Sequence, residues 1–424
     1  MKRVLTTTST VVLLAVLALE LGGAGAAVGK TWSITPVGGS SVVADAIASA
    51  ADGDTVILRS GIYRESGIVV DKRLTLVGEG TPVIDGGEMG QIIAVTADGV
   101  RITGLEIANV GVSYMEDRAG IKLIEVKDCV IEGNRFTNTF FGIYLENCGN
   151  CTIRNNVIKA EYLRETASGN GIHLWYCRDI LIDGNRITGH RDGIYFEFVE
   201  HSTITNNISE RNLRYGLHFM FSHHDRYERN VFRKNGAGVA VMFSDDVIMR
   251  ENTFEHNWGS ASYGLLLKDI RDSDITHNRF HRNTIGLYSE GSMRLVIEKN
   301  EFTDNGYAMK VMSSSSDNRI TANNFINNTF DVSTNSRQNF NEFDGNYWSR
   351  YQGYDLDRDG VGDVPYRPVH LFSLLVEREP AGLILLRSFF VDLIDAAEQA
   401  MPLYTPPTLL DRRPVINPVD LERS

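Results

Sequence analysis

A repeat of about 22 residues constrains the fold of this chain more than any other feature. One column, apolar-x-x-Asn-x-apolar, places asparagines at Asn134, Asn156, Asn185, Asn207, Asn230, Asn252, Asn278, Asn300 and Asn323. A second column, Gly-apolar-x-apolar, starts at Gly120, Gly142, Gly171, Gly193, Gly216, Gly238, Gly264 and Gly286, with Ala308 in the next place. By subtraction, both columns step by 22 to 29 residues and lengthen in the same two repeats. A shared period of this kind predicts stacked structural units with loops at the two longer repeats.

The composition of each repeat predicts β-strands. Ile, Val, Phe and Tyr occur in short alternating runs, and no run is long enough for a helix. At least two runs per repeat argue against a leucine-rich repeat, which pairs one strand with a leucine scaffold. Asn tolerates the αL conformation of tight turns, and stacked Asn amides hydrogen-bond from coil to coil. We therefore expect an all-β fold, a single-stranded parallel β-helix of about ten coils and roughly 50 Å.

The N-terminal residues predict export and a cap. Lys2 and Arg3 precede an apolar run and an A-x-A match, which predicts a signal peptide over residues 1–26 and a location outside the cytoplasm. Residues 42–51 predict an amphipathic helix that covers the open edge of the first coil. The helix and the strands after it resemble the N-terminal cap of right-handed β-helix proteins of the pectin-lyase type. That resemblance implies a right-handed coil over residues 27–350, a fold with many functions.

The charge balance narrows the class of partner. The chain has 54 acidic and 42 basic residues, which gives a net charge of −12 at pH 7. An anionic surface of this kind repels phosphate groups, so nucleic acid and anionic membranes are not expected as main partners.

The glycine column determines which side chains face outward. Residues one and three after each glycine are apolar and point inward, so residues two and four point outward. This outward face carries aromatic, His, Met and Glu side chains where a solvated sheet carries Lys, Thr and Ser. Its most distinctive members form a candidate partner surface, or equally a sugar-stacking platform: Tyr144, His173, Trp175, Tyr195 and Glu197.

One group on this face has the ligand types of a copper site. His218 and Met220 share a strand, Met242 lies one coil away, and His223 and His224 follow shortly after. Thioether and imidazole ligands suit Cu(I) better than Mg²⁺ or Ca²⁺. The alternative is that the two methionines stack as an apolar patch beside a surface histidine.

Glu146 and Glu197 suggest an alternative function, that of an enzyme. They share an outward column two coils apart, roughly 10 Å by strand spacing. That separation is near the upper limit for an inverting glycosidase pair, so a polysaccharide lyase or glycosidase is the alternative function. Exposed Glu columns are also common on β-helices without catalysis.

The four cysteines follow the repeat. Cys129 stacks on Cys151, and Cys148 stacks on Cys177, one coil apart in each case. Stacked positions have nearly parallel Cβ vectors, which strains a disulfide, so we expect buried thiols rather than disulfides. Cys148 and Cys151 also form a C-x-x-C motif, but it bridges a turn between strands rather than opening a helix, which disfavours redox chemistry.

An acidic loop and a cap are expected over residues 351–370. Asp355, Asp357 and Asp359 are followed by Gly360, which is how a calcium loop begins, and Asp363 lies just beyond. Tyr366 stands where an EF-hand has its bidentate Glu. A calcium-stiffened cap and a metal-free loop of Asx turns are both compatible with the pattern.

Residues 371–424 are expected to form a helix and a Pro-rich tail. Apolar residues recur at helical spacing after Pro380 and before Pro402, and we expect five of them to dock on a membrane partner: Leu383, Leu386, Phe390, Leu393 and Ile394. Charged residues between them rule out a bilayer-spanning helix. The alternative is that the helix packs back on the last coil.

Three further segments are distinctive: Tyr215–Ser222 (YGLHFMFS), Asn346–Ser349 (NYWS) leading into Gly353–Tyr366, and the helix expected after Pro380. Together they resemble the NosD family of periplasmic maturation factors for nitrous oxide reductase. The similarity extends over essentially the whole mature chain.

The resemblance implies a non-catalytic periplasmic β-helix bound to the permease and ATPase of an ABC transporter. It implies copper received from a membrane-anchored chaperone lipoprotein and passed toward nitrous oxide reductase during cluster assembly. Copper at the His218 face would be transient, and the C-terminal helix would dock on the permease. ATP hydrolysis would belong to the cytoplasmic subunit, because this sequence has no phosphate-binding loop.

Overall fold

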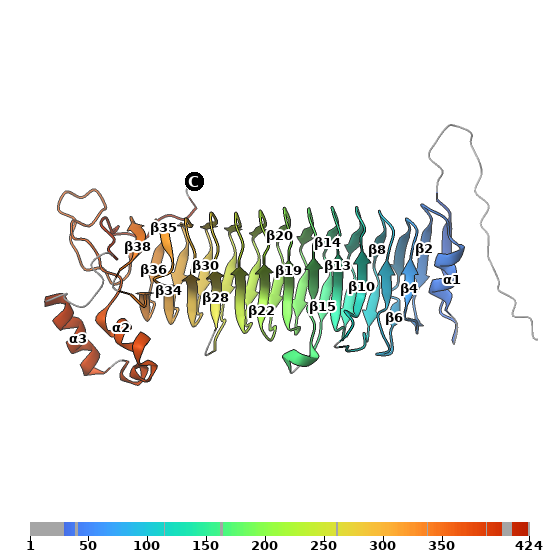
Figure 1. Cartoon of the computed structure of the whole chain (residues 1–424), viewed down its shortest axis with the longest axis horizontal. Coiled ribbons are helices and arrows are strands. Elements are labelled where there is room, and N and C mark those ends of the chain that lie inside the picture. The colour runs from blue at the N-terminus through green and yellow to red at the C-terminus, as the bar shows by residue number, and fades with distance from the viewer. Residues whose placement is uncertain are drawn as a thin grey trace, which may run out of the picture.

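Each coil of the molecule contains three strands, one more than the minimum that the sequence pattern required. The computed structural model describes residues 29–38, 41–113, 115–161, 164–259, 262–336, 338–386, 388–400 and 409–422. The expected signal peptide lies outside these residues. The strands stack along one axis into a rod (Figure 1), with all pairings between neighbouring coils parallel. The fold is therefore the expected all-β, single-stranded, right-handed parallel β-helix.

Three sheets run the length of the rod. Sheet A contains β1 (Thr31–Ile34), β2 (Thr55–Arg59), β5 (Thr75–Glu79), β8 (Arg101–Thr103), β11 (Val130–Glu132), β14 (Thr152–Arg154), β17 (Leu181–Asp183), β20 (Thr203–Thr205), β23 (Arg226–Glu228), β26 (Ile248–Arg250), β29 (Asp274–Thr276), β32 (Val296–Glu298), β35 (Ser316–Thr321) and β38 (Phe340–Asp344). Sheet B contains β3 (Ile62–Tyr63), β6 (Val83–Asp85), β9 (Glu106–Ala108), β12 (Arg135–Thr137), β15 (Val157–Lys159), β18 (Arg186–Thr188), β21 (Ile208–Glu210), β24 (Val231–Arg233), β27 (Thr253–Glu255), β30 (Arg279–His281), β33 (Glu301–Thr303), β36 (Asn324–Ile326) and β39 (Tyr347–Trp348). Sheet C contains β4 (Ile68–Val70), β7 (Ile93–Val95), β10 (Ala119–Ile124), β13 (Phe141–Glu146), β16 (Ile172–Trp175), β19 (Asp192–Glu197), β22 (Tyr215–Met220), β25 (Ala237–Met242), β28 (Tyr263–Lys268), β31 (Ile285–Glu290), β34 (Tyr307–Val311) and β37 (Phe330–Ser333).

The rod is longer than the expected ten coils. Sheets A, B and C contain 14, 13 and 12 strands. The additional coils come from residues 31–108, where β1 to β9 pair like the later strands but carry neither the Asn nor the Gly column. Strand pairing needs only alternating buried Val, Ile and Leu. The repeated Asn and Gly turn residues therefore could not reveal these coils.

The asparagine column forms a continuous buried ladder. The amide oxygen of Asn252 accepts the backbone N–H and the side-chain N–H of Asn230, both at 3.0 Å, and Asn252 repeats the pattern toward Asn278. Each side chain also donates to a carbonyl, as Asn230 does to Ile204 at 2.9 Å. A second ladder, not recognised in the sequence, runs through Asn212, Asn235, Asn257, Asn283, Asn305 and Asn328. Both ladders satisfy turn N–H groups that lie away from water.

The core beside the ladders is a column of stacked rings in sheet B. Phe254, Phe280, Phe302, Phe325 and Trp348 follow one another at centroid distances of 4.7, 4.6, 5.0 and 4.1 Å, with nearly parallel planes. Apart from Trp348, which is 1% exposed, these rings are fully buried. Because the repeat is in register, equivalent side chains of successive coils lie on top of one another. One aromatic position per coil therefore forms a continuous apolar stack.

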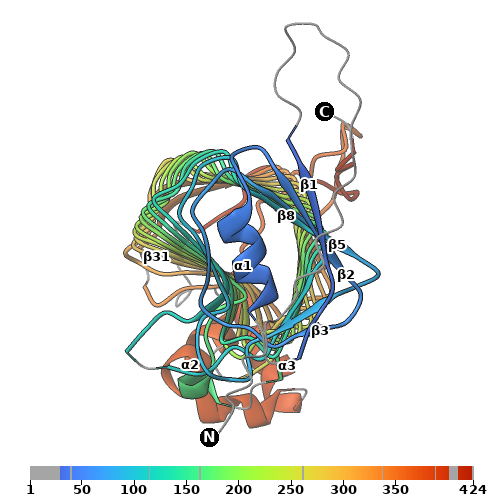
Figure 2. The same cartoon turned by 90° about the vertical axis from the view of Figure 1, so that its right-hand side faces the viewer.

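The expected N-terminal capping helix is present as α1 (Val42–Ser49). Figure 2 shows it lying across the open end of the coil. The buried carboxylate of Glu65 accepts the backbone N–H groups of Val43 and Ala44 at the start of α1. At its end, the ammonium group of Lys72 donates to three carbonyls at 2.8 to 3.0 Å. Both charges complement the helix dipole and the unpaired backbone groups of the helix ends.

The single helix expected after Pro380 is instead two shorter elements, the 3₁₀ helix η2 (Pro380–Leu385) and α3 (Phe389–Ala400). A further helix, α2 (Leu371–Arg378), precedes them. Pro380 separates α2 from η2, since proline fits the first turn of a helix but not its interior. Phe372 and Val376 of α2 pack on Phe330 of the last sheet C strand.

Residues 409–422 also differ from the expected docking tail. They lie against the last coil, where Asp411 forms bridges with Phe343 and Tyr366, and Val415 forms bridges with Tyr347 and Val361. Asp411 is fully buried and takes the place that the next asparagine of the ladder would occupy. This segment therefore caps the rod rather than extending away from it.

Candidate functional site

The register of sheet C confirms the outward columns predicted from the glycines. One column aligns Lys122, Tyr144, His173, Tyr195, His218, Ala240, Leu266, Tyr288 and Lys310. The next aligns Ile124, Glu146, Trp175, Glu197, Met220, Met242, Lys268 and Glu290. These nine coils bring together residues that are as many as 188 positions apart in the chain, from Lys122 to Lys310.

Much of the first column is covered by neighbouring side chains rather than open to solvent. Tyr144 stacks on His173 at 4.5 Å with an interplanar angle of 5°, and His173 stacks on Tyr195 at 4.8 Å. Phe141 closes the side of His173 edge-on at 5.3 Å. Tyr144, His173 and His218 are only 5, 8 and 4% exposed. Of the predicted partner surface, Trp175, Tyr195 and Glu197 therefore remain partly accessible, whereas Tyr144 and His173 form their support.

His173 is held as a neutral imidazole. The side-chain amide of Asn170 donates to its Nδ1 at 2.9 Å. Burial, with a smaller contribution from the positive charge of Arg191, lowers the pKa of His173 to about 3. The ring is thus uncharged at neutral pH and serves as an aromatic spacer between two tyrosines.

His218 is a buried imidazole without a hydrogen bond. Neither ring nitrogen has a hydrogen-bond partner among the described residues, and Nδ1 lies 3.8 Å from a carboxylate oxygen of Asp192, within the range of an ion pair if the ring is protonated. Asp192 is itself engaged by Arg214, whose Nε donates to it at 2.9 Å. Burial opposes ionisation of Asp192, yet the hydrogen bonds and charge of Arg214, together with the nearby His218 ring, lower its pKa to about 2. Tyr195 and Tyr215 flank the His218 ring at 4.9 and 4.8 Å.

The two methionines lie next to this histidine. Met220 is two residues after His218 on β22, and Met242 is its register partner on β25. Both methionine side chains are partly exposed, whereas the His218 ring is buried. Ala240, beside His218 in register, presents only a methyl group. The arrangement brings one imidazole and two thioethers to neighbouring positions on two adjacent strands.

The other two histidines of the predicted group face different partners. They lie in the turn after β22, where Nδ1 of His223 accepts the backbone N–H of Asp245 at 3.1 Å. The Nδ1 of His224 lies 2.9 Å from a carboxylate oxygen of Asp246, and its ring stacks on His201 at 5.0 Å. The structure therefore separates a His218–Met220–Met242 group from a pair of turn histidines that is already bonded to the next coil.

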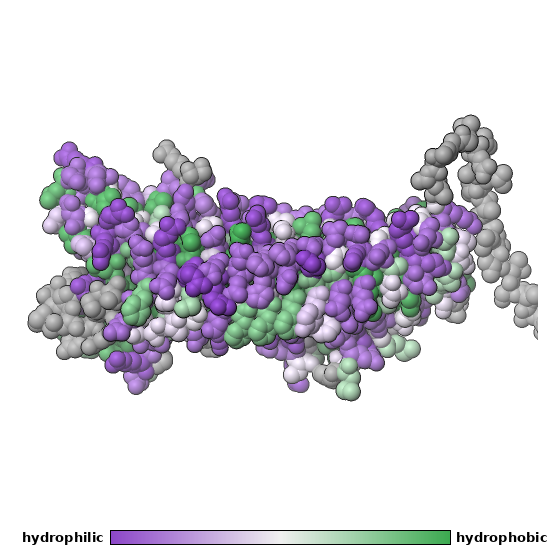
Figure 3. Space-filling view, turned by 45° about the horizontal axis from the view of Figure 1, so that its top comes forward, coloured by the Kyte–Doolittle hydropathy of each residue, from purple (hydrophilic) through white to green (hydrophobic). Residues whose placement is uncertain are grey.

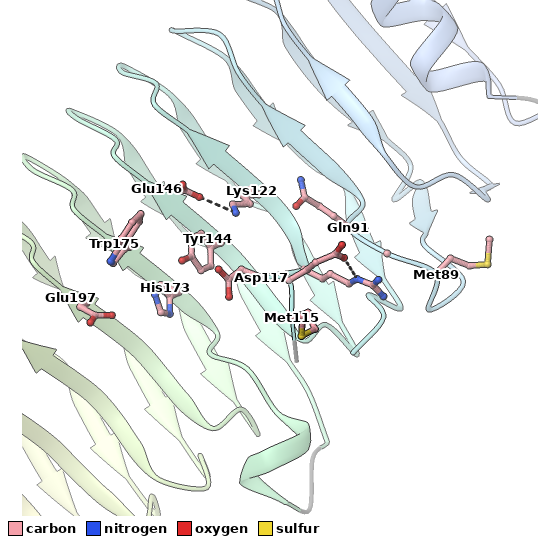
Figure 4. Close-up of a pocket in the computed structure, with 13 residues that line it drawn as sticks. Met89, Gln91, Met115, Asp117, Lys122, Tyr144, Glu146, His173, Trp175 and Glu197 are labelled. Atoms are coloured by element: carbon pink, nitrogen blue, oxygen red, sulfur yellow. Dashed lines mark hydrogen bonds and ion pairs between the residues drawn. The ribbon is translucent and has the colours of Figure 1, made fainter. Parts of the chain in front are cut away.

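A cavity of about 920 Å³ lies at the N-terminal end of the same face. Strands β10, β13, β16 and β19 provide its floor, and the loops around Met89 and Met115 provide its walls (Figure 4). Glu146, Trp175 and Glu197 follow one another along this floor in successive coils. Lys122 forms an ion pair with Glu146 at 2.9 Å and lies 4.8 Å from the centre of the Tyr144 ring.

Glu146 and Glu197, the carboxylate pair of the glycosidase hypothesis, therefore lie in one cavity. They differ in whether a cationic side chain pairs with them. Glu146 is already held by Lys122, whereas Glu197 has no cationic partner among the described residues. An ammonium group at 2.9 Å occupies the position that a leaving-group oxygen would need at Glu146. The geometry gives the enzymatic hypothesis no further support.

An aromatic stripe next to the methionines was not recognised in the sequence. Tyr176, Phe198, Phe221 and Phe243 each follow directly after the second outward column, at the turn, and all have positive φ of 50 to 55°. Their rings stack at 4.6, 5.3 and 5.1 Å. Three of the four are 38 to 50% exposed, and one side of the rod is apolar midway along its length (Figure 3). Bulky residues are rare in the αL region, so aromatic residues recurring at this turn position were the available signal.

All four cysteines are free and buried, as expected. Cys148 and Cys177 donate to the carbonyls two residues before them, Glu146 and Trp175, at 3.3 and 3.4 Å. In later coils Ser222 and Ser244 make the same bond at the equivalent position. The cysteines thus replace serines of a turn motif, which gives them a structural place in the coil.

The acidic loop holds its carboxylates close together. Ligand atoms of Asp355, Asp357 and Asp359 lie within 4.8 Å of one another. The Asp355 carboxylate accepts the N–H groups of Arg358 and Gly360, and Asp363 accepts that of Leu356 at 2.7 Å. These are the Asx turns of the metal-free alternative, and calcium binding here stays a prediction.

The five predicted docking residues do not share one helix face. Leu386 and Ile394 pack against the Phe330, Phe372 and Val376 cluster at the end of the rod. Leu383, Phe390 and Leu393 are 44, 49 and 55% exposed. No helix in the described part of the chain is long and apolar enough to cross a membrane.

Solved structures similar to this one share its fold. The family 28 exopolygalacturonase of Yersinia enterocolitica has a TM-score of 0.60 at 11% identity, with 74% of this chain and 78% of that chain covered. An alginate lyase from Paenibacillus sp. has a TM-score of 0.52 at 17% identity, with 62% and 99% covered. At these identities the likeness concerns the β-helix alone.

Similarity in sequence is more informative. A protein of Pseudomonas aeruginosa named "Probable ABC transporter binding protein NosD" is 32% identical over 392 residues, which cover 88% of this chain and 90% of that protein. A protein of the same name from Stutzerimonas stutzeri is 26% identical, with 85% and 86% covered. The family model described as "Periplasmic copper-binding protein (NosD)" matches residues 47–163 and 159–353. Because these matches span most of the β-helix, the chain belongs to the NosD family.

Proposed function

We propose that this protein accepts copper in the periplasm as a binding component of an ABC transporter and assists copper-cluster assembly in nitrous oxide reductase. The observation that carries the proposal is His218, a buried imidazole whose two nitrogens make no hydrogen bond among the described residues, beside Met220 and Met242. Membership of a family described as periplasmic and copper-binding supports the choice of metal.

The buried His218 ring carries a free-energy cost while its nitrogens make no hydrogen bond. Leaving a buried donor or acceptor without a partner costs about 1–3 kcal/mol, so such a group in a native protein calls for an explanation. A Cu(I) ion coordinated by an imidazole nitrogen would remove this penalty at His218. Thioether sulfur completes a soft ligand set, and unbranched methionine side chains can move toward an ion without moving the backbone.

The position of His218, Met220 and Met242 suits transient binding of copper. His218 lies beneath the surface while Met220 and Met242 are partly exposed, so an ion would meet the thioethers before the imidazole. The adjacent carboxylate, Asp192, is neutralised by Arg214 and does not compete as a hard ligand. A site of two weak thioether ligands and one imidazole binds Cu(I) without the tight hold of thiolates.

The proposed partners follow from the same family. They are the permease and ATPase of the transporter, a copper chaperone lipoprotein that loads the site, and nitrous oxide reductase that receives the metal. The C-terminal elements offer the surface for the permease, because Leu383, Phe390 and Leu393 remain exposed at one end of the rod. In this scheme ATP is hydrolysed by the partner ATPase, and the β-helix binds without catalysing a reaction.

The direct test is an anaerobic Cu(I) titration against a competing chromophoric chelator. We expect the purified protein to bind Cu(I), and M220L, M242L and H218N each to weaken binding by about tenfold or more, as for loss of one ligand. M312L is the matched control, since Met312 follows β34 in the same outward column but has no histidine beside it. Equal affinities in all four variants would show that copper binds elsewhere.

The assembly role needs a separate test in cells. We expect the triple variant H218N/M220L/M242L to lower the copper content of nitrous oxide reductase. The amount and the melting temperature of the variant protein itself should stay unchanged. Full copper loading by the triple variant would refute the role of this site, whatever the titration shows.

A further inference from the structure

The cavity at the N-terminal end of sheet C has a charge that its own residues do not balance. Four carboxylates line it, from Glu116, Asp117, Glu146 and Glu197, against two cations, Arg118 and Lys122. Both cations are engaged, because Arg118 pairs with Glu116 at 2.9 Å and Lys122 pairs with Glu146 at 2.9 Å. His173 is neutral. The balance of four negative and two positive charges leaves a net charge of −2, carried by Asp117 and Glu197.

The two unbalanced carboxylates lie on opposite sides of an aromatic floor. Asp117 lies near Tyr144, where its charge adds to the effect of burial in raising the pKa of that hydroxyl. Glu197 follows Trp175 in the outward column, and Trp175 in turn follows Glu146 (Figure 4). The indole is partly exposed, and Tyr176 meets it edge-on at 4.9 Å. An indole between two carboxylates attracts a cation both by its ring face and by the neighbouring charges.

We propose that this cavity binds a basic segment of a protein partner, with one guanidinium or ammonium group on Trp175 beside Glu197 and a second near Asp117. The proposal goes beyond copper binding and does not depend on the His218 group. It assigns to the cavity a ligand class, a short extended peptide with two cationic side chains.

The dimensions of the cavity favour a peptide over a smaller cation. Its floor spans the strands β10, β13, β16 and β19, which are three inter-strand spacings of about 4.8 Å, or about 14 Å in all. An extended chain covers that length in about four residues. A volume of about 920 Å³ lies near the upper end of the range for ligand sites and far exceeds what one ion fills.

The charge argues against the substrates of the polysaccharide enzymes that share this fold. A uronate chain would bring its own carboxylates next to Asp117 and Glu197, with both cations of the cavity already paired. Repulsion between like charges at such distances is unfavourable, most of all where water is partly excluded. A neutral glycan would not meet this repulsion, so it belongs in the test as a competitor.

The test uses the full mature protein and a defined probe, the blocked tetrapeptide acetyl-Arg-Gly-Gly-Arg-amide, followed by calorimetry. Its control is the same peptide with both arginines replaced by uncharged citrulline. We expect the arginine peptide to bind in a salt-sensitive manner and the citrulline peptide to bind at least tenfold more weakly. E197Q and W175F should each weaken binding by between about threefold and thirtyfold, the range of a partly desolvated cation–π contact or ion pair.

E290Q is the matched control, because Glu290 stands in the same column outside the cavity. It should bind the arginine peptide like the unmodified protein, and so should M220L/M242L, which separates this result from the fate of the copper proposal. Unchanged thermal melting curves would show that each variant is folded. Equal binding of the two peptides would overturn the proposal. So would equal affinity of E197Q and E290Q, or tighter binding of a neutral glucan tetrasaccharide than of the arginine peptide.

Discussion

Removing the carboxylate of Asp411 should open the C-terminal end of the rod. Asp411 terminates the asparagine ladder, because one of its oxygens accepts the backbone N–H and the side-chain N–H of Asn346, both at 3.0 Å, and the indole N–H of Trp348 at 2.9 Å. Its other oxygen accepts the N–H groups of Gly345 and Arg413 at 3.2 Å. A carboxylate suits this place, since the last member of the ladder has only donors to satisfy.

The magnitude follows from the donors that lose their acceptor. In D411A, the side-chain amide of Asn346 keeps its bond to Ile320, but its backbone N–H and the indole N–H of Trp348 become unpaired and buried. Two such groups at about 1–3 kcal/mol each give about 2–6 kcal/mol. Because each coil of a solenoid contacts only its neighbours, this energy destabilises the end of the rod rather than the whole molecule.

Hydrogen exchange read by mass spectrometry measures this local stability directly. We expect peptides covering residues 340–350 to exchange about 30-fold or more faster in D411A, while peptides of the central coils stay unchanged. D411N is the control variant, since its amide oxygen can still accept from Asn346 and Trp348. A change below threefold in D411A would refute the view that residues 409–422 cap the rod.

The remaining predictions concern protonation, the thiols and the ladder. Since the folded pKa of His173 is about 3 and the unfolded value is about 6.5, the contribution of His173 to stability should be constant above pH 7 and fall as pH drops from about 6.5 toward 3. At pH 4.5 this contribution is a loss of about 2–3 kcal/mol, measured as the difference between the unmodified protein and H173Q in the change of urea unfolding free energy from pH 7, and an equal change in both proteins would contradict it. All four thiols should be unreactive to a thiol reagent in the native protein and fully reactive after denaturation, and a count below four would reveal a disulfide. C148S should change the unfolding free energy by less than about 1.5 kcal/mol, because serine makes the same turn bond in other coils, and a larger loss would argue for a special role of the thiol. N252A should cost about 2–6 kcal/mol by leaving the Asn230 N–H and the Tyr227 carbonyl unpaired, which a thermal melt can detect and an unchanged melt would contradict.

Where a turn repeats, position in the sequence was enough to predict position in space. The glycine column predicted that Glu146, Trp175 and Glu197 are register neighbours, and the structure pairs them in that order. The same reasoning placed Met220 beside Met242. It worked because a parallel in-register stack has one rule for every coil, so local periodicity carries long-range information.

Where the repeat stops, the prediction weakened. The coils over residues 31–108 lack the turn signals and were not counted, and the single helix expected after Pro380 proved to be two elements, η2 and α3. The repeat pattern also could not predict which outward side chains are buried. Tyr144, His173 and His218 point away from the core, yet they are covered by rings of adjacent coils and by side chains from the strand starts.

The sequence by itself determined the parallel coil, the phase of its strands, the columns of outward residues and the family. Each of these depends on a local rule that repeats every coil. Only the tertiary structure decided that the His218 imidazole is buried without a hydrogen bond, that the charges of the cavity do not balance, and that Asp411 closes the ladder. These properties depend on contacts between side chains from different coils and from the distant C-terminal segment, whose distances and burial no periodic pattern records.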